Sequence, residues 1–269
     1  MIKHIGVIGC GWLGLPLAQT LAKKEYTVSG TTTSTEKLSL LSESGIVPFQ
    51  ISLSEKRIEG AITEFLEPLD VLVINIPPGL RGSGKQESYV GKIKLLYAHL
   101  KTTGPRKVLF ISSTSVYGEA TGTLTEKDIP APSSESGRQL LECERLFRND
   151  QELHSTIIRF GGLIGPDRHP ISMLSGRENL KAGNAPVNLI HQDDCIQIIT
   201  SVIEMELWDT VINAVHPYHP TKREYYTHEA IKRGLKPPLY LPDTGTQHKL
   251  IDSCNPFLIN NYVFLTPIN

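Results

Sequence analysis

The sequence lacks the features that would mark a nucleic-acid-binding, membrane or secreted protein. Its 27 lysines and arginines are balanced by 28 acidic residues, for a net charge of −1 at pH 7. This balance argues against nucleic acid or an anionic membrane surface as a partner. No apolar run approaches the ~20 residues that cross a bilayer. A strand expected to begin at Ile2 leaves no room for a secretory signal peptide.

Cysteine is also scarce. The four cysteines lie far apart and form no CxxC or metal-binding spacing: Cys10, Cys143, Cys195 and Cys254. Such thiols are typical of a reducing compartment, so we expect a cytoplasmic protein with no metal site. The remaining composition, with 39% hydrophobic and 20% charged residues over 269 positions, fits one large globular domain or one domain with a smaller lobe.

Strand and helix signals alternate over the first 160 residues. Six apolar runs have the length of strands: HIGVIG, YTVSGT, IVPFQI, DVLVINI, KVLFIS and STIIRF. Helical patterns occupy 13–24, 88–102 and 136–149, and Ser34 is expected to cap a further helix running through Leu38 and Leu41. The alternation predicts an α/β fold with a Rossmann-type, doubly wound parallel sheet.

Glycine and proline become frequent after Phe160, in segments such as GGLIGPDRHP and GLKPPLYLPD. Two more helices are expected there, near 193–206 and 221–233. We therefore predict a Rossmann domain at 1–165 and a small C-terminal substrate lobe at 166–269. The lobe is expected to be partly interleaved with the first domain and to cover the carboxyl edge of its sheet.

A glycine motif, GCGWLG, follows the first predicted strand and opens the first predicted helix. In this context Gly9 makes a tight turn, Gly11 lets the main chain approach a pyrophosphate, and Gly14 lets the helix pack close to the strand. The helix then presents N–H groups to the phosphates, with Trp12 and Leu13 at its start. The motif predicts a dinucleotide site rather than a glycine turn without a ligand.

The second predicted strand ends in SGTTTSTEK, where an NAD site usually carries an acidic residue for the adenosine ribose. No acid occurs there before Glu36. The stretch instead offers hydroxyl groups and one positive charge, from Thr31, Thr32, Thr33 and Lys37. An acid would repel a 2′-phosphate and this set would accept one, so the stretch favours NADP over NAD as the cofactor.

Three further segments occur in the order of a known family. FISSTSVYGE ends the fifth predicted strand, RFGGLIGP follows the sixth, and NLIHQDDCIQII leads into a helix. Together with the glycine motif they resemble the extended short-chain dehydrogenase/reductase superfamily, in its NAD-dependent epimerase/dehydratase group. The resemblance covers essentially the whole chain. It implies a pyridine nucleotide cofactor and a polar small-molecule substrate such as a sugar nucleotide.

The resemblance also implies roles for single residues. Ser113 holds the position of the family's serine that polarises the substrate oxygen, with Ser112 beside it on the cofactor side. The loop NIPPGLRG after the fourth strand would line the cofactor, with contacts from Asn75, Pro77 and Pro78. Arg81 and Lys85 would receive an anionic group or lie in solvent.

The family's acid–base pair, Tyr-x-x-x-Lys followed by a glutamate, has no counterpart in its usual place. If Glu144 is that glutamate, Ser136 and Leu140 occupy the Tyr and Lys positions. The alternative register, from Glu142, gives Ser134 and Arg138. Neither contains a tyrosine, and none occurs from 118 to 217.

Other candidates have ordinary explanations. Two Tyr-x-x-x-Lys strings exist, Tyr97–Lys101 and Tyr218–Lys222. The first precedes the serine strand, so its chain order is wrong. The second contains Pro220, which disfavours the helical turn that would align the pair. For His191 and Asp194, in the segment before a helix, we expect structural hydrogen bonds.

The glycine motif departs from the family as well, because Ile8 holds the position of the first glycine in GxxGxxG. These departures resemble an atypical, YeeZ-like branch of the superfamily, with HPISML and HPTKREYY as further marks.

Two functions are consistent with this pattern. The first is an NAD(P)-dependent oxidoreductase or epimerase/dehydratase-like enzyme, in which Ser113 holds the substrate oxygen and Tyr117, a loop histidine or water supplies the proton. The second is a non-catalytic module that binds NADP(H) and senses redox state or regulates a partner. The retained serine favours the first function and the absent pair favours the second. The sequence leaves the oligomeric state open.

Overall fold

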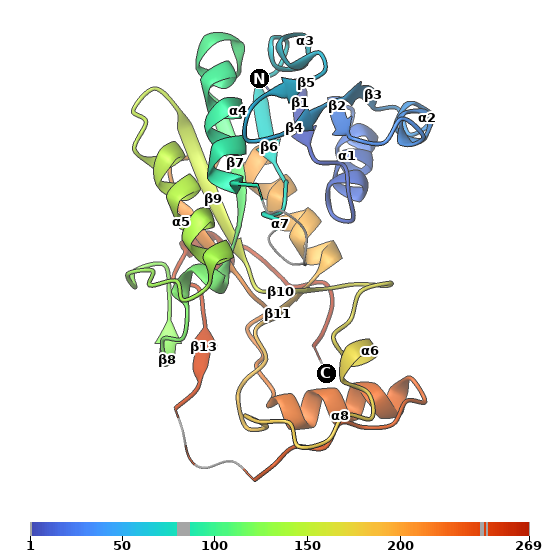
Figure 1. The fold of residues 1–269 in the computed structure, drawn as a ribbon, viewed down its shortest axis with the longest axis vertical. Helices are drawn as coiled ribbons and strands as arrows, with labels where there is room; N and C mark the ends of the chain where they lie inside the picture. The colour runs from blue at the N-terminus through green and yellow to red at the C-terminus, as the bar shows by residue number, and fades with distance from the viewer. Residues whose placement is uncertain (1, 80–86, 243–244, 246, 269) are drawn as a thin grey trace.

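The computed structural model describes residues 2–79, 87–242, 245 and 247–268. A seven-stranded sheet forms the centre of the molecule (Figure 1). Its strands are β1 (His4–Ile8), β2 (Thr27–Thr32), β3 (Val47–Gln50), β6 (Val71–Ile74), β7 (Lys107–Ser113), β9 (His154–Phe160) and β12 (Val211–Ala214). They lie in the order β12-β9-β7-β6-β1-β2-β3, and every neighbouring pair is parallel. The prediction of a doubly wound parallel sheet is confirmed.

Six of these strands coincide with the predicted apolar runs. All four residues of β6 are buried, as are the last four of β1. Strands covered on both faces need no polar side, which is why they read as continuous apolar runs. The order of the strands reverses between β1 and β6, and in such sheets this is the point where ligands bind.

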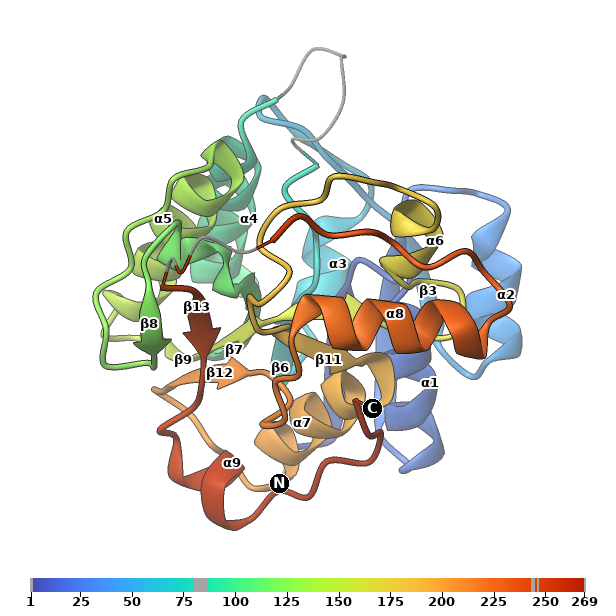
Figure 2. The same cartoon turned by 90° about the horizontal axis from the view of Figure 1, so that it is seen from below.

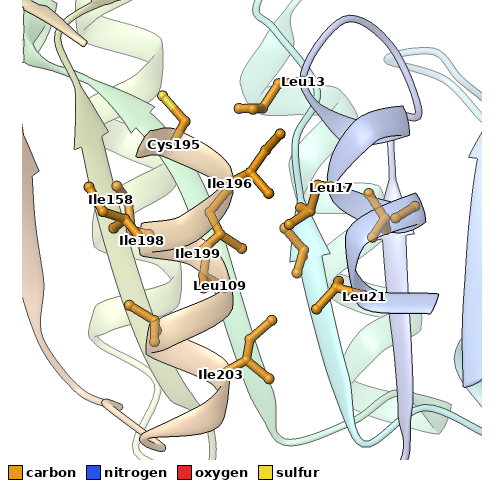
Figure 3. Packing of buried hydrophobic residues seen from close by; sticks show 14 of the residues in the cluster. Leu13, Leu17, Leu21, Leu109, Ile158, Cys195, Ile196, Ile198, Ile199 and Ile203 are labelled. Atoms are coloured by element: carbon orange, nitrogen blue, oxygen red, sulfur yellow. The ribbon is translucent and has the colours of Figure 1, made fainter. Parts of the chain in front are cut away.

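Helices cover both faces of the sheet. One face carries α1 (Gly14–Lys23), α2 (Lys37–Glu43) and α7 (Gln192–Glu204), and the other carries α3 (Ile62–Leu66), α4 (Tyr89–Thr103) and α5 (Glu135–Arg148). Figure 2 shows α4 and α5 on one side of the sheet and α1 and α7 on the other. In Figure 3, Leu13 and Leu17 of α1 face Ile196 and Ile199 of α7, so these helices pack side by side with their first residues at the same edge.

Smaller elements surround the sheet, most of them at its carboxyl edge. They are the strand pairs β10 (Gly162–Ile164) with β11 (Leu189–His191), β8 (Gly122–Leu124) with β13 (Lys249–Ile251) and β4 (Ser52–Leu53) with β5 (Ile58–Glu59), and the helices η1 (Thr114–Tyr117), α6 (Ile171–Leu174), α8 (Lys222–Lys232) and α9 (Pro256–Asn260). A separate apolar cluster joins α6 and α8 to the β10–β11 pair. None of the helices in the described ranges is long and apolar enough to cross a membrane.

The chain beyond residue 165 does not stay in the lobe. Both α7 and β12 return to the central sheet and its apolar layer. The polypeptide passes between the lobe and the central sheet more than once. The division into two domains at residues 165 and 166 therefore stays a prediction.

The prediction that Ser34 caps the second helix is wrong. Helix α2 begins at Lys37, and its N-cap residue Glu36 makes no side-chain cap. Ser34 is held in a turn instead, since its N–H donates to the Thr32 hydroxyl at 3.1 Å and its carbonyl accepts from the Lys37 N–H at 3.2 Å. The turn includes Thr35 and Glu36, so the helix starts two residues later than a cap at Ser34 would allow.

Candidate cofactor and substrate site

The three glycines of the GCGWLG turn have different surroundings. Gly9 has φ +99°, and a Cβ there would lie 2.6 Å from the Asn75 carbonyl oxygen. A Cβ on Gly14 would lie 2.2 Å from the Gly9 oxygen. A Cβ on Gly11 would meet nothing within 4 Å. Packing of the chain itself therefore requires Gly9 and Gly14, whereas Gly11 faces open space that a ligand can approach.

Neighbouring strands fix this turn in place. The Thr31 hydroxyl accepts a hydrogen bond from the Gly9 N–H at 3.0 Å, and the Thr31 carbonyl accepts from the Cys10 N–H at 2.9 Å. From the other side, the Asn75 side-chain amide donates to the Gly9 carbonyl at 3.1 Å. Thr31 and Asn75 thus shape the turn from β2 and from the end of β6.

Cys10 points away from the open side of the turn. Its sulfur packs against Gly30, where a Cβ would lie only 2.7 Å away. Burial raises the pKa of the Cys10 thiol to about 12, so the group is a neutral packing element.

Helix α1 starts without a side-chain cap. Its N-cap residue is Leu13, and its first turn holds no acidic residue. The first N–H groups of a helix have no intrahelical acceptor, and they carry the positive end of the helix dipole. An apolar cap therefore leaves this end available to an anion.

The predicted adenosine end of the site is more open. Thr32 is buried, but Thr33 and Lys37 are exposed. On the neighbouring strand end, Pro77 is exposed and Pro78 is half-buried. The predicted contacts Arg81 and Lys85 lie outside the described residues.

Ser112 and Ser113 end β7 and point in opposite directions, as successive strand residues do. The Ser113 hydroxyl is half-buried and accepts from the Ser115 N–H at 3.1 Å. The Ser112 hydroxyl is buried and donates to Glu144 Oε1 at 2.6 Å. Only Ser113 therefore remains partly open at the carboxyl edge.

Behind these serines lies a buried ion pair that the sequence did not reveal. Arg159 on β9 binds Glu144 on α5 through Nη2 and Oε2 at 2.6 Å and through Nε and Oε1 at 3.0 Å. The same guanidinium donates to the Tyr117 hydroxyl at 2.8 Å. A positive residue inside an otherwise apolar strand was the available signal, but it did not identify a partner.

Tyr117 is 1% exposed. Besides the donor on Arg159, its hydroxyl has two acceptors at 2.9 Å, the Asn213 side-chain oxygen and the Thr125 carbonyl. Burial raises the pKa of this phenol above its ordinary value. This geometry favours a packing role for Tyr117 over proton donation to a substrate.

Glu144 is the family's glutamate in one of the two predicted registers, and the structure places it in the buried ion pair with Arg159. On this helix Ser136 and Leu140 lie two turns and one turn before Glu144, on the face that carries it. Between them, Gly137 packs so closely that a Cβ would lie 2.8 Å from the Ser115 carbonyl. Leu140 is buried at 4% exposure. The residues of the alternative register, Ser134 and Arg138, have structural roles at the surface. Ser134 caps the helix and Arg138 binds Glu135.

Among the described residues, neither Tyr-x-x-x-Lys string makes a hydrogen bond to the Ser113 side chain. Tyr97 and Lys101 both bind Asp150, at 2.6 and 2.8 Å, just before β9 begins. That point lies toward the amino edge of the sheet, whereas Ser113 ends a strand at the carboxyl edge. Tyr218 is 57% exposed in the loop after β12.

His191 and Asp194 make structural bonds at the start of α7. The His191 ring caps the helix by accepting from the Asp193 N–H. The Asp194 carboxylate is fully buried and accepts from the Tyr262 hydroxyl and from the N–H groups of Leu265 and Thr266. Asp194 thereby anchors residues 262–266 to the helix.

His169 lies in the lobe beside a cavity of about 230 Å³. Its Nε2 is 2.9 Å from the Tyr225 hydroxyl, and its Nδ1 accepts from the Ile171 N–H. Burial lowers the pKa of His169 to about 4, with Arg233 adding to the effect. Over the described ranges, no group of three or more His, Cys, Asp or Glu residues could hold a metal ion.

Comparison with known proteins agrees with this geometry. The sequence model of the NAD-dependent epimerase/dehydratase family matches residues 5–213. Protein YeeZ of Escherichia coli K12 is 32% identical over 260 residues, which cover 94% of both chains.

The fold is similar to that of UDP-glucuronic acid 4-epimerase from Bacillus cereus in complex with NAD, with a TM-score of 0.80, 20% identity, and coverage of 99% of this chain and 93% of that one. It is also similar to MoeE5 in complex with UDP-glucose and NAD, with a TM-score of 0.78, 21% identity, and coverage of 98% and 94%. The family match and the identity to YeeZ cover nearly the whole fold described above. The chain belongs to the NAD-dependent epimerase/dehydratase family.

Proposed function

We propose that this protein binds a pyridine dinucleotide at residues 9–14 and acts with it on a polar small molecule, as an oxidoreductase or an epimerase/dehydratase-like enzyme. The observation that carries the proposal is the open space at Gly11, between two glycines that internal packing requires. When bound, such a cofactor supplies hydride transfer.

The chain offers contacts along the length of a dinucleotide. The N–H groups at Trp12 and Leu13 would take the diphosphate, and Pro77 and Pro78 would line the path toward the nicotinamide. The buried Ser112 hydroxyl, bound to Glu144, does not face this path. At the adenosine end, Thr33 and Lys37 are exposed. Thr31 and Thr32 are the last two residues of β2 and directly precede Thr33. The absence of an acid at the end of β2, before Glu36, supports NADP over NAD.

For the substrate, Ser113 is the group that supports catalysis. Its hydroxyl stands at the carboxyl edge and would hold a substrate oxygen by a hydrogen bond. Because the Tyr117 hydroxyl is engaged inside the protein, water or a loop histidine is the better proton donor. The two structural neighbours named above are complexes with NAD, one of them also with UDP-glucose, which supports a sugar nucleotide as the substrate class. The four free thiols support a reducing compartment such as the cytoplasm.

A second candidate function is a non-catalytic sensor of NADP(H). The observation in its favour is the face of α5 that leads to Glu144, where Ser136 and buried Leu140 offer no phenol and no amine. Such a protein would bind the cofactor and turn over no substrate.

Calorimetric titration with NADPH and with NADH tests cofactor binding directly. Incubation with UDP-sugars, aldehydes and ketones, followed by chromatography of the products, then separates the enzyme from the sensor. Absence of any dinucleotide binding would overturn the proposed function, whereas binding without turnover would favour the sensor.

A further inference from the structure

Trp12 joins the glycine turn to the lobe. Its carbonyl accepts a hydrogen bond from the Gln192 side chain at 2.6 Å. Its indole packs against Gly165, where a Cβ would lie 2.7 Å from the ring. The loop after β10 is therefore built around the side chain of a residue whose own N–H faces the predicted diphosphate.

Arg168 covers the other part of this indole. Its guanidinium carbon lies 5.0 Å from the Trp12 ring centroid. Reciprocal backbone hydrogen bonds between Gly165 and Arg168, at 2.9 and 3.2 Å, close the loop and hold the arginine there. The residue is exposed, and among the described residues its guanidinium has no carboxylate partner. A guanidinium stacked on an aromatic ring keeps its N–H groups available to an oxyanion.

The glycine turn itself supplies no basic side chain to a diphosphate. Residues 9–22, which contain the turn and most of α1, include no lysine or arginine. The helix terminus alone offers only about half a positive charge. A dinucleotide diphosphate carries a larger negative charge, and an arginine can bind two of its oxygens at once.

We propose that Arg168 binds the diphosphate of the dinucleotide from the lobe side, opposite the N–H groups of α1. This inference rests on the proposed function. It means that a bound cofactor is held by both parts of the molecule, and that the 165–168 loop is tied to the glycine turn when the site is filled.

The test compares Arg168→Gln with a matched control, Arg177→Gln, which removes the same charge from an exposed site after α6 in the same lobe. NADPH is titrated into each protein by calorimetry at two salt concentrations. We expect the Kd of Arg168→Gln to rise about tenfold, or ~1.4 kcal/mol, with a weaker dependence on salt, and that of Arg177→Gln to stay unchanged. Adenosine 2′-monophosphate, which lacks the diphosphate, should bind wild type and Arg168→Gln equally.

Each other result overturns the inference in a recognisable way. If wild type binds NADPH and Arg168→Gln binds within twofold of it, Arg168 does not contact the diphosphate and the proposed function stands. An equal loss in Arg177→Gln, or a loss of adenosine 2′-monophosphate binding, would assign the effect to overall charge or to altered folding. If wild type binds no dinucleotide, the inference and the proposed function fall together.

Discussion

The guanidinium of Arg159 and the carboxylate of Glu144 face each other inside the protein, 2.6 Å apart at their closest atoms, and neither side chain is more than 2% exposed. Ser112 and Tyr117 complete the hydrogen bonds of this pair. It connects β9, α5 and the end of β7, directly beneath the candidate site.

Glu144→Gln should destabilise the protein by about 3–5 kcal/mol, because it leaves the buried Arg159 charge uncompensated. Glu142→Gln is the control on the same helix, since Glu142 binds Lys94 at the surface. It should change stability far less. Urea denaturation measures both. Equal losses of stability in the two variants would show that the buried ion pair contributes no more to stability than the surface pair.

Gly11→Val should abolish dinucleotide binding while leaving the fold intact, because its side chain would project into the open space where the diphosphate is expected. Gly14→Ala should instead lower the melting temperature, since its Cβ would collide with the Gly9 oxygen. Calorimetry and thermal unfolding separate the two effects. Binding by Gly11→Val at wild-type strength would contradict the cofactor site.

Wild type should bind NADPH more tightly than NADH, and Lys37→Glu should reduce or reverse that preference. An acidic side chain at this exposed position would repel a 2′-phosphate, while NADH binding would change little. Lys23→Glu, at the far end of α1, controls for the change in net charge. Titrations at one ionic strength decide the matter, and a tenfold preference of wild type for NADH would contradict the prediction.

Ser113→Ala should slow turnover of any substrate found, because it removes the hydroxyl expected to hold the substrate oxygen. A positioned acid–base group contributes about 10²–10⁴ in rate. Tyr97→Phe and Tyr218→Phe should leave the rate nearly unchanged, since Tyr97 is bound to Asp150 toward the amino edge and Tyr218 is exposed in the loop after β12. A loss of that size in either phenylalanine variant, with cofactor binding intact, would identify an acid–base tyrosine that the geometry does not favour.

Stability should fall as the pH is lowered from 7 toward 4, in part because of His169. Its pKa is about 4 in the folded protein and ordinarily near 6.5, so the unfolded chain binds more protons between these values. The contribution is complete above pH 6.5 and is lost as the pH falls toward 4. Around the ring lie Tyr225, Glu229, Lys232 and Arg233. His169→Gln should therefore lose less stability than wild type between pH 7 and 5 in parallel urea unfolding curves.

The sequence predicted the central sheet because its strands are buried on both faces. The apolar runs that became β1, β6 and β7 needed no tertiary information to be recognised. The strand Val211–Ala214 was missed, because its apolar run is interrupted by Asn213 and lies in the glycine- and proline-rich region after Phe160 that was assigned to the lobe. The local sequence pattern also gave a wrong prediction at Ser34, which forms a turn instead of capping the helix.

The candidate site was predictable where backbone geometry dictates the residue, as at Gly9 and Gly14. It was less predictable where side chains from distant segments meet. Arg159 and Glu144 are 15 positions apart and lie on different elements. A charged residue within an apolar strand indicates that a partner exists, but the sequence does not identify which residue it is. Arg168 gave no signal at all, since its position over Trp12 depends on a loop more than 150 residues away in the chain.

The anchoring of residues 262–266 on Asp194 has a consequence for synthesis. Until those residues leave the ribosome, the Asp194 carboxylate has no Tyr262 hydroxyl and no N–H of Leu265 or Thr266 to bind. A carboxylate without these donors resists burial. The start of α7 therefore lacks these bonds until Tyr262, Leu265 and Thr266 have been made, and a nascent chain stalled before Tyr262 should be more open to proteolysis around this helix than the folded protein.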